Sequence, residues 1–465
     1  MTVHDDLTLP SAEATAELTA RVTGDVFTPG DEGYAREVGG FNLRSGHRPL
    51  LVVAVATPSD VQAAVTFALA HDLAVGVKTT GHQPFPARDG FVLITTGALN
   101  SVEIDAERAV ARVGGGARWK DVIGPAQEAG LAPLNGSAPD VGVVGYTLGG
   151  GLSPLLGRTY GWAVDHVVSL EVVTADGELR RVSADAEPGL FRALRSGRSN
   201  FGVVTEIEFG LFPVTSFYGG GLYFPGEHAE EVLRAFAALT RGSLPAEFNC
   251  SVALLNLPPL PEVPEPFRGK FVAHVRVSHL GSDEEAERLI APFRAIGPTL
   301  VDTVARQPYG AMGGVHADPV DPAPYEELGT LLAEFPDEAL DGIVDYARSM
   351  PGGPVAVVEL RRLGGALDAV PEQAAPLGAR GAAFVVWGAT VGPPEVVVAG
   401  ESVLRDLTAR LRPWSTGLLY TNFTGREDGA ADTFPAGTLA DLREAKRRYD
   451  PRNLFRVNNH NITPA

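Results

Sequence analysis

Cysteine is almost absent from this chain of 465 residues, in which Cys250 is the only one. A single cysteine cannot form an intramolecular disulfide, and it cannot supply a cysteine-based zinc site. Lysine is also scarce, since only 4 of the 38 basic residues are lysines. Acidic residues number 57, and the net charge of −19 argues against the basic surface that nucleic acids and anionic membranes require.

Long apolar runs are missing as well. No stretch of about 18 residues is free of charged residues, glycine and proline, so we expect no membrane-spanning helix. Residues 1–18 have neither the basic start nor the apolar centre of a secretion signal. The ten histidines are scattered, and no pair of them has metal-ligand spacing on one helix face. We therefore expect a cytoplasmic protein without a metal.

Several catalytic motifs are absent too. The sequence has no phosphate-binding Gly-x-x-x-x-Gly-Lys-Ser/Thr loop, no Gly-x-Ser-x-Gly nucleophile elbow and no His-Glu-x-x-His zinc motif. No Gly-x-Gly-x-x-Gly follows a predicted strand, which weakens the case for a nicotinamide-dependent dehydrogenase. Such a dehydrogenase would also be colourless as isolated.

Glycine and proline are abundant, at 54 and 36 residues, and are spread among apolar runs, which indicates many tight turns. Residues 50–80 predict a strand–helix–strand unit, because apolar positions recur at helical spacing after Pro58 and an apolar run returns over 73–78. We expect further strands over 91–95, 109–113, 167–174, 179–182 and 202–214, and a helix over 119–129. Asp176-Gly177 predicts a hairpin turn between two of these strands.

The middle of the chain has a different pattern. Helical segments over 227–241, 282–297, 337–350 and 393–412 alternate with strands over 271–279, 355–361 and 382–389, which favours an α+β domain with helices on one face of its sheet. The last part predicts a strand over 418–423 and a helix over 439–449, which Asp450-Pro451 ends.

Two segments carry the chemistry. The first, Lys78-Thr79-Thr80-Gly81-His82, follows a strand, at the end where α/β sheets tend to bind ligands. The second is a glycine-rich, apolar segment over 135–151. Glycine lets the backbone approach a ligand closely, so this segment suits a flat ring system or a diphosphate.

Four motifs in order show a family resemblance. They are the 78–82 loop, the glycine-rich loop over 138–151, Asn-Phe-Gly-Val-Val-Thr at 200–205, and Tyr-Asp-Pro-Arg-Asn-Leu-Phe-Arg at 449–456. Together they resemble the berberine-bridge-enzyme-like FAD-linked oxidases, which have the vanillyl-alcohol-oxidase fold. The resemblance spans nearly the whole chain. It implies an α+β protein with a PCMH-type, two-subdomain FAD-binding domain over 1–214 (core about 46–214), a substrate domain over 215–412, and a segment over 413–465 that returns to the FAD domain.

The resemblance also implies the cofactor site. His82 would bond covalently to the flavin, and a neutral imidazole is a competent nucleophile near neutral pH. The residues expected to hold FAD are Lys78, Thr79, Thr80, Gly81, Gln83, Ser137, Ala138, Val141, Gly142, Gly145, Tyr146, Gly149, Gly150, Val203, Val204, Asn458 and Asn461.

Four departures from the family pattern bear on this chemistry. Ala138 replaces a cysteine that makes a second flavin bond in many members, so we expect a single, histidyl link. Lys78 and Thr80 replace an arginine and a glycine of the first loop. Arg198 replaces a glycine, where it adds positive charge near the cofactor or caps a helix. Phe423 replaces a tyrosine that helps to deprotonate substrate, so another base is needed.

Glu359 is the main candidate for that base. Alternation along 355–361 puts Val355, Val357, Glu359 and Arg361 on one face, where burial would raise the pKa of Glu359 into a useful range. The alternative is a Glu359–Arg361 ion pair. Tyr420 and Tyr146 are weaker candidates, as either catalytic or packed aromatic residues. Arg361, Asn422 and Phe423 are expected to contact substrate.

We therefore expect an FAD-dependent oxidoreductase that oxidises a small organic substrate, with O2 as electron acceptor. The composition is compatible with bacterial secondary metabolism. Two alternatives stay open: a flavin-N5-oxide monooxygenase, because Ala138 leaves space beside the flavin, and a protein that holds FAD for a non-redox cyclisation or for binding. The sequence does not predict the oligomeric state.

Overall fold

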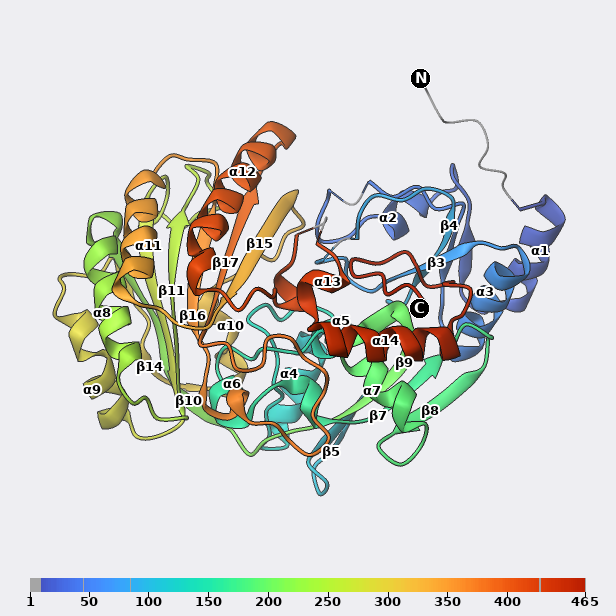
Figure 1. Cartoon of the computed structure of the whole chain (residues 1–465), viewed down its shortest axis with the longest axis horizontal. Helices are drawn as coiled ribbons and strands as arrows, with labels where there is room; N and C mark the ends of the chain where they lie inside the picture. The colour runs from blue at the N-terminus through green and yellow to red at the C-terminus, as the bar shows by residue number, and fades with distance from the viewer. Residues whose placement is uncertain (1–9, 45, 84, 426–427, 465) are drawn as a thin grey trace.

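The computed structural model describes residues 10–44, 46–83, 85–425 and 428–464. Three sheets organise this part of the chain. Two smaller sheets, built before residue 215, lie to the right in Figure 1, and a large sheet with its helices lies to the left. The α+β class expected from the sequence is confirmed.

The first sheet contains the predicted strand–helix–strand unit. Its order is β1 (Asp25–Phe27), β2 (Leu51–Ala54), β4 (Phe91–Thr95) and β3 (Ala74–Lys78), in which β4 runs parallel to both β2 and β3. Helix α3 (Pro58–Ala70) connects β2 to β3 and begins at a capping box formed by Thr57 and Asp60. The unit is confirmed, although β4 lies between its two strands. Helices α1 (Ala12–Arg21) and α2 (Tyr34–Val38) precede it.

The second sheet is antiparallel throughout. Its order is β5 (Val102–Asp105), β6 (Val110–Gly114), β9 (Val203–Gly210), β7 (Val167–Val173) and β8 (Leu179–Ser183). The helices between these strands are α4 (Trp119–Glu128), α5 (Val143–Leu148), α6 (Gly157–Tyr160) and α7 (Pro188–Gly197), with the 3-10 helices η1 (Ala163–His166) and η2 (Arg198–Asn200).

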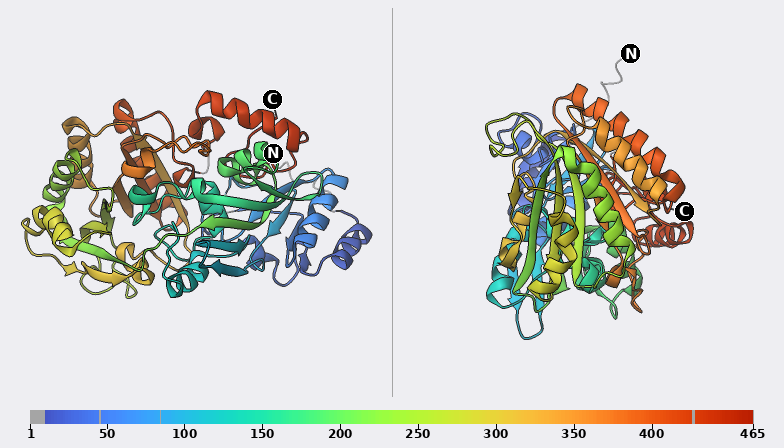
Figure 2. Two further views of the ribbon diagram at one scale, coloured as in Figure 1. Left: turned by 90° about the horizontal axis from the view of Figure 1, so that it is seen from below. Right: turned by 90° about the vertical axis from the view of Figure 1, so that its left-hand side faces the viewer.

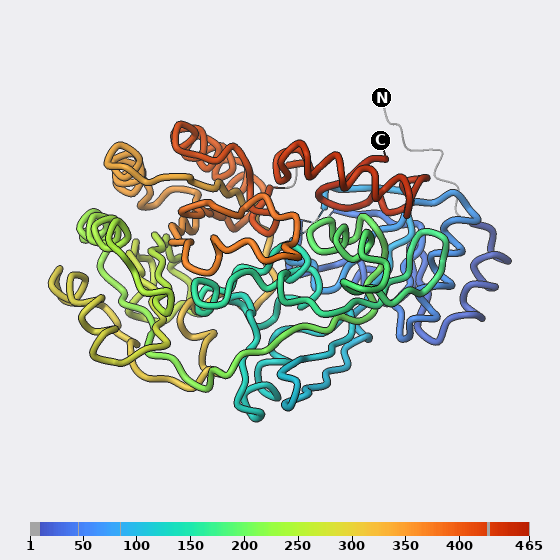
Figure 3. Tube along the Cα trace, turned by 60° about the horizontal axis from the view of Figure 1, so that its bottom comes forward, coloured from blue at the N-terminus to red at the C-terminus, as the bar shows by residue number. Residues whose placement is uncertain are grey.

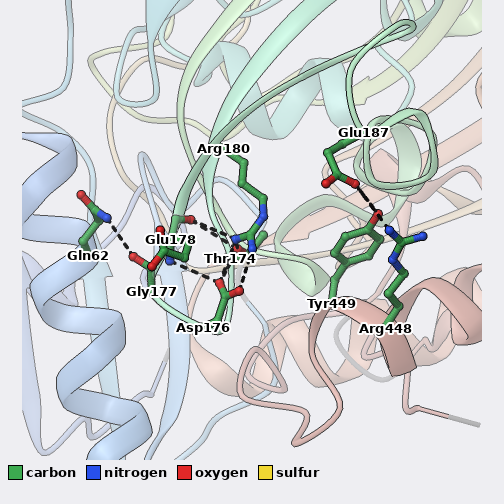
Figure 4. Close-up of polar contacts among 9 residues, drawn as sticks. All are labelled: Gln62, Thr174, Asp176, Gly177, Glu178, Arg180, Glu187, Arg448 and Tyr449. Carbon is green, nitrogen blue, oxygen red and sulfur yellow. Dashed lines mark hydrogen bonds and ion pairs between the residues drawn. The ribbon is translucent and has the colours of Figure 1, made fainter.

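The predicted Asp176-Gly177 hairpin joins β7 to β8 and also holds the first two sheets together (Figure 4). Gly177 has φ 80°, and a Cβ there would lie 2.6 Å from Thr66 Oγ1 of α3. Gln62 of the same helix donates a hydrogen bond of 2.9 Å to the Gly177 carbonyl. Arg180 pairs with Asp176 at 2.7 Å and fixes the turn from the strand side. The glycine is thus required both by the turn and by the helix packed against it.

The third sheet is the expected sheet of the middle region. Its order is β13 (Val301–Asp302), β10 (Ser216–Pro225), β12 (Phe271–His279), β11 (Phe248–Asn256), β16 (Val357–Arg362), β17 (Phe384–Val391) and β15 (Tyr325–Leu332), and β14 (Ala305–Pro308) also pairs with β10. All its pairings are antiparallel.

One face of this sheet carries the helices α8 (Ala229–Arg241), α9 (Asp283–Arg294), α11 (Asp337–Ser349) and α12 (Pro394–Leu411), as the right-hand view of Figure 2 shows. Leu328, Leu360 and Val386 point from the strands into the apolar core beneath these helices. The predicted one-sided cover of helices is confirmed. The other face is turned towards the two N-terminal sheets, with α10 (Gly313–His316) and the 3-10 helices η3 (Gly226–His228), η4 (Tyr309–Ala311), η5 (Gly365–Asp368) and η6 (Arg412–Trp414) in the connections.

The C-terminal part crosses back to the N-terminal half. The strand predicted over 418–423 is wrong: this stretch is irregular and ends in the 3-10 helix η7 (Thr421–Phe423), because its polar groups bond to the glycine-rich segment instead of to a neighbouring strand. Helices α13 (Ala430–Thr433) and α14 (Ala436–Tyr449) follow, and α14 lies against α7 (Figures 1 and 3). Leu454 then accepts a backbone hydrogen bond from Val75 of β3.

The division at residues 214/215 and 412/413 stays a prediction. In the part of the chain that the structure describes, no helix is both long enough and apolar enough to span a bilayer.

Candidate active site

A cavity of about 480 Å³ lies between the N-terminal half and the face of the large sheet opposite α8, α9, α11 and α12. Its wall combines the loop after β3, the glycine-rich segment with α5, the turn before β9, the strands β15 to β17 and the C-terminal segment. Segments far apart in sequence therefore meet at one concave site, as in ligand-binding enzymes. No cluster of three or more histidine, cysteine or acidic side chains suited to a metal ion is found among the described residues.

The large sheet supplies the cavity wall through strand alternation. Residues on the cavity face are Tyr325 and Glu327 of β15, Val357, Glu359 and Arg361 of β16, and Trp387, Ala389 and Val391 of β17. The predicted face of 355–361 is thus correct from Val357 onwards. Val355 precedes the strand and packs into the core on the helix side.

His82 lies at the cavity wall in the loop after β3. Its ring stacks on Phe41 with the centroids 4.0 Å apart, and its Nδ1 lies 2.9 Å from Thr80 Oγ1. Tyr325 donates a short hydrogen bond to the His82 carbonyl. Burial, helped by the charge of Arg118, lowers the pKa of His82 to about 4, so the imidazole is neutral at neutral pH. A neutral, held imidazole at this place is able to act as a nucleophile.

Orphaned polar atoms in the cavity wall indicate that a polar ligand belongs there. The hydroxyl of Tyr146, Nε of Arg198 and Oδ1 of Asn458 are buried and have no hydrogen-bond partner in the described structure. Such groups are costly unless a ligand or water satisfies them. The loop after β3 is packed closely against the segment around Gly40, because a Cβ on Gly81 would lie 2.8 Å from the Gly40 Cα. The unsatisfied polar atoms of the wall fit a flat, polar cofactor such as FAD.

Most of the predicted cofactor residues meet at this cavity. Those in its wall are Lys78, Thr79, Thr80, Gly81, His82, Gln83, Ser137, Ala138, Val141, Gly142, Gly145, Tyr146, Val204 and Asn458. Gly149, Gly150, Val203 and Asn461 are not part of the wall. Val203 points to the opposite side of β9 from Val204 and packs in the core of the first sheet. Gly149 is covered by Arg198 and Asn422, which occupy the space where a Cβ would stand.

Glu359 is in the cavity wall, but the predicted rise of its pKa is wrong. The carboxylate lies 3.0 Å from Arg361 and 3.0 Å from Arg276, and His316 Nε2 is 3.7 Å away. Burial opposes ionisation, yet the two guanidinium groups and the His316 contact hold the pKa well below its usual range. Glu359 is therefore an ionised partner of arginines, as the ion-pair alternative expected. An anion held this firmly is a poor proton acceptor, which argues against Glu359 as the base.

The two candidate tyrosines also line the cavity. The Tyr420 oxygen accepts hydrogen bonds from Leu152 N–H at 2.9 Å and from Asn422 Nδ2 at 3.0 Å. Burial nevertheless raises the pKa of Tyr420 to about 12, and it raises the pKa of Tyr146 well above its usual range. Both side chains are neutral phenols at neutral pH, so they can donate hydrogen bonds but are not ready to accept a proton.

Glu327 was not foreseen from the sequence. It stands on β15, which was not predicted as a strand, and its carboxyl accepts a hydrogen bond of 2.8 Å from Trp387 Nε1. Burial raises the pKa of Glu327 to about 8. The alternation of Glu327 with the buried Leu328 is the only sequence signal that could have placed it on the cavity face.

Arg198 is the most unusual cation in the wall. It donates to Gln83 Oε1 at 2.7 Å and makes a short hydrogen bond to Asn422, but within the described structure it has no acidic ion-pair partner. Burial lowers its pKa to about 10, so it remains charged. The predicted substrate residues Arg361, Asn422 and Phe423 lie in the same wall.

This fold and site define a flavin-binding oxidoreductase. Residues 49–183 match the family described as FAD binding domain. The chain is 30% identical over 459 residues to (R)-6-hydroxynicotine oxidase of Paenarthrobacter nicotinovorans, a match that covers 95% of this chain and 97% of that relative. It belongs to the berberine-bridge-enzyme-like family of FAD-linked oxidases.

Two further relatives add to this assignment. The crystal structure of 6-hydroxy-D-nicotine oxidase from Arthrobacter nicotinovorans covers 100% of both chains at 25% identity, with a TM-score of 0.81. An FAD-dependent monooxygenase of Cochliobolus heterostrophus, tpcD, is 35% identical over 198 residues, which are 42% of this chain and 37% of that relative. The expected FAD cofactor and the FAD-dependent oxidoreductase function are thereby confirmed.

Proposed function

We propose that this enzyme is an oxidase that carries FAD on a single covalent link through His82 and passes electrons from a small organic substrate to O2. The observation that carries the proposal is the neutral, half-buried His82, which lies in the cavity wall in the loop after β3. Ala138 lies in the same wall and offers no nucleophile for a second link. Cys250 supplies none either, because it is buried in the core on the helix side of the large sheet.

When bound, FAD would supply the hydride acceptor for the oxidation. The chain's own residues would hold the cofactor and would orient and polarise the substrate. The loops over 78–83 and 137–146, with Val204 and Asn458, would hold the cofactor. Residues outside the cavity wall would support these loops, namely Gly149, Gly150, Val203 and Asn461. Tyr420 and Tyr146 would donate hydrogen bonds to substrate or cofactor, and Arg361, Asn422 and Phe423 would orient the substrate.

The covalent link is tested by denaturing the yellow holoenzyme in acid and measuring the flavin that stays with the polypeptide. We expect full retention in the wild type and complete loss in His82→Ala. His47→Ala is a matched control, because His47 also lies in the cavity wall and stacks on Phe85 at 4.0 Å. Free FAD released from the wild type would contradict the link, and so would flavin retained by His82→Ala.

The oxidase activity is tested by anaerobic bleaching of the flavin. A panel begins with 6-hydroxynicotine, the compound in the relative's name, and continues with other secondary amines, alcohols and phenols. We expect one class to bleach the flavin and air to restore the colour with release of hydrogen peroxide. Bleaching would exclude the alternative in which FAD serves only binding or a non-redox cyclisation.

A monooxygenase is the second candidate. It is supported by the similarity of 198 residues of this chain to a protein named as an FAD-dependent monooxygenase and by the small side chain of Ala138 in the cavity wall. Oxygen from labelled O2 would then appear in the product, whereas an oxidase would release it as hydrogen peroxide. The proposed function also includes a cytoplasmic location and a role in secondary metabolism.

A further inference from the structure

Glu327 is a carboxyl group in the cavity wall. Among the described residues, it forms no ion pair, whereas Glu359 on the same face has two arginines in contact. Its neighbour Glu326 points to the opposite side of β15, where Arg44 lies 2.6 Å from its carboxylate. The three carboxyl groups of β15 and β16 therefore divide into two that are paired with arginines and one that lies in the cavity wall without an ion-pair partner among the described residues.

The position of Glu327 is fixed by one hydrogen bond. Trp387 Nε1 donates to Oε2 at 2.8 Å from the adjacent strand β17. The other oxygen, Oε1, has no hydrogen-bond partner in the described structure, and the residue lines the cavity. One oxygen is thus held by the protein and the other is available to a ligand, an arrangement suited to a positioned proton acceptor.

The surroundings of Glu327 are aromatic. The rings of Trp387 and Phe423 lie 5.5 Å apart, and Tyr325 stands two residues before Glu327 on the same face. An apolar enclosure disfavours the ionised carboxylate. It also favours a substrate that presents an apolar or planar body beside the group that loses its proton.

We propose that Glu327 is a catalytic residue of this oxidase, the group that takes a proton from a hydroxyl or ammonium group of the substrate. The proposal rests on the proposed function. The O–H or N–H bond of the substrate breaks, its proton moves to Glu327 Oε1, and its electron pair forms the new C=O or C=N bond. The hydride on the adjacent carbon passes to the FAD, so the substrate loses two electrons and two hydrogens. Phe423 cannot accept this proton because its ring has no basic group, so Glu327 accepts it.

The charges around Glu327 agree with this role. Burial raises its pKa, and the neighbouring charge of Glu326 acts in the same direction. The Trp387 hydrogen bond and the charge of Arg198 act in the opposite direction. Asp428 lies near the same end of the strand, where it accepts a hydrogen bond from Gly425 N–H. The resulting pKa of about 8 lies close to the pH at which a general base works best.

The ionisation is measured on the holoenzyme without any substrate. Infrared difference spectra between pH 6 and pH 10 should show a carboxylic acid that loses its proton near pH 8. The signal should be absent in Glu327→Gln, present in the control Glu326→Gln, and shifted to higher pH in Trp387→Phe, which removes the hydrogen bond to the ionised form. A carboxyl that is already ionised at pH 6, or a signal that Glu327→Gln leaves unchanged, would overturn the proposal.

The catalytic role is measured with the first panel compound that bleaches the flavin anaerobically. We expect the bleaching rate of the wild type to rise with pH and level off above pH 8, and to fall by about 100-fold or more in Glu327→Gln at equal flavin content. Glu327→Asp keeps a carboxyl and should retain part of the rate and the pH dependence. A rate in Glu327→Gln within about threefold of the wild type would overturn the role. If no compound bleaches the flavin, the oxidase proposal fails, and the infrared titration alone decides the ionisation of Glu327.

Discussion

The ammonium group of Lys446 lies 2.7 Å from the carboxylate of Asp450, and neither side chain is exposed at all. Lys446 also donates 2.6 Å to the carbonyl of Asn200, just before β9. Asp450 accepts hydrogen bonds from the N–H groups of Leu454 at 2.7 Å and Phe455 at 3.0 Å. This pair joins the end of α14 to the turn before β9 and to the segment that runs beside β3. The Lys446–Asp450 pair therefore holds the C-terminal segment against the N-terminal half of the protein.

Removing the Lys446–Asp450 ion pair should destabilise the protein strongly. Lys446→Met leaves the buried Asp450 carboxylate without its counter-charge, so we expect the free energy of unfolding to fall by about 3–5 kcal/mol. Urea unfolding of the holoenzyme measures the change. Arg410→Met is the control. Arg410 and Asp406 are also four residues apart and form an ion pair, but this pair lies at the surface. The control substitution should lower the free energy of unfolding by less than about 0.5 kcal/mol. An equal loss in both variants would contradict the structural role of the Lys446–Asp450 pair.

Arg198 has a backbone conformation that side chains rarely adopt. Its φ of 52° and ψ of −136° lie in a region that glycine occupies freely, which agrees with the glycine that the family resemblance leads one to expect at this position. Strain of this kind is found where function requires it. Here it directs a charged guanidinium at Gln83 and Asn422 in the cavity wall.

Arg198→Gly and Arg198→Ala separate the strain from the charge. Both remove the guanidinium, but only glycine relieves the backbone, so we expect Arg198→Gly to be more stable than Arg198→Ala by about 1–2 kcal/mol. Both should lower the flavin reduction potential by the same amount, because both remove one positive charge from the cavity. Thermal unfolding and potentiometric titration measure the two effects. Equal stability of the two variants would show that the backbone at Arg198 is not strained.

The elements with strong local signals were predictable from the sequence. The strand–helix–strand unit begins with a capping box, and the 176–177 hairpin has a turn that only glycine fits well, so local rules were sufficient. The glycine-rich loop and His82 could be placed at one site because their motifs occur in a fixed order. The structure brings them to a single cavity.

The failures lie where tertiary contacts decide. The stretch over 418–423 has the apolar content of a strand, but in the described part of the chain it pairs with no strand, and Asn422 donates instead to the Tyr146 carbonyl. The pKa of Glu359 was misjudged because Arg276 comes from β12, which lies beyond β11 in the sheet and whose place beside Glu359 cannot be read from local pattern. Glu327 was missed for the same reason, since its role depends on Trp387 from the neighbouring strand.

Glu359 should contribute to stability rather than to proton transfer. Because its folded-state pKa lies below that of the unfolded chain, its contribution is present above about pH 4.5 and is lost as the pH falls through the folded-state value. Glu359→Gln leaves Arg276 and Arg361 without their shared anion, so we expect a loss of about 3 kcal/mol at pH 7. Urea unfolding of both proteins between pH 8 and pH 4 should show a constant difference down to about pH 5 and a smaller one below. A carboxyl with a raised pKa would instead give a difference that changes between pH 6 and pH 8.

The lowered pKa of His82 predicts how covalent attachment depends on pH. An ordinary histidine with a pKa of about 6.5 is only about 9% neutral at pH 5.5, whereas His82, with a pKa of about 4, stays almost wholly neutral there. If the neutral ring is the nucleophile, flavin-free protein mixed with FAD should form the acid-stable adduct at nearly the same rate at pH 5.5 and pH 7.5. The yield of flavin in the acid precipitate, sampled over time, gives this rate. A tenfold slower reaction at pH 5.5 would mean that His82 titrates as an exposed histidine does, and that burial between Phe41 and the cavity does not prepare it for the bond.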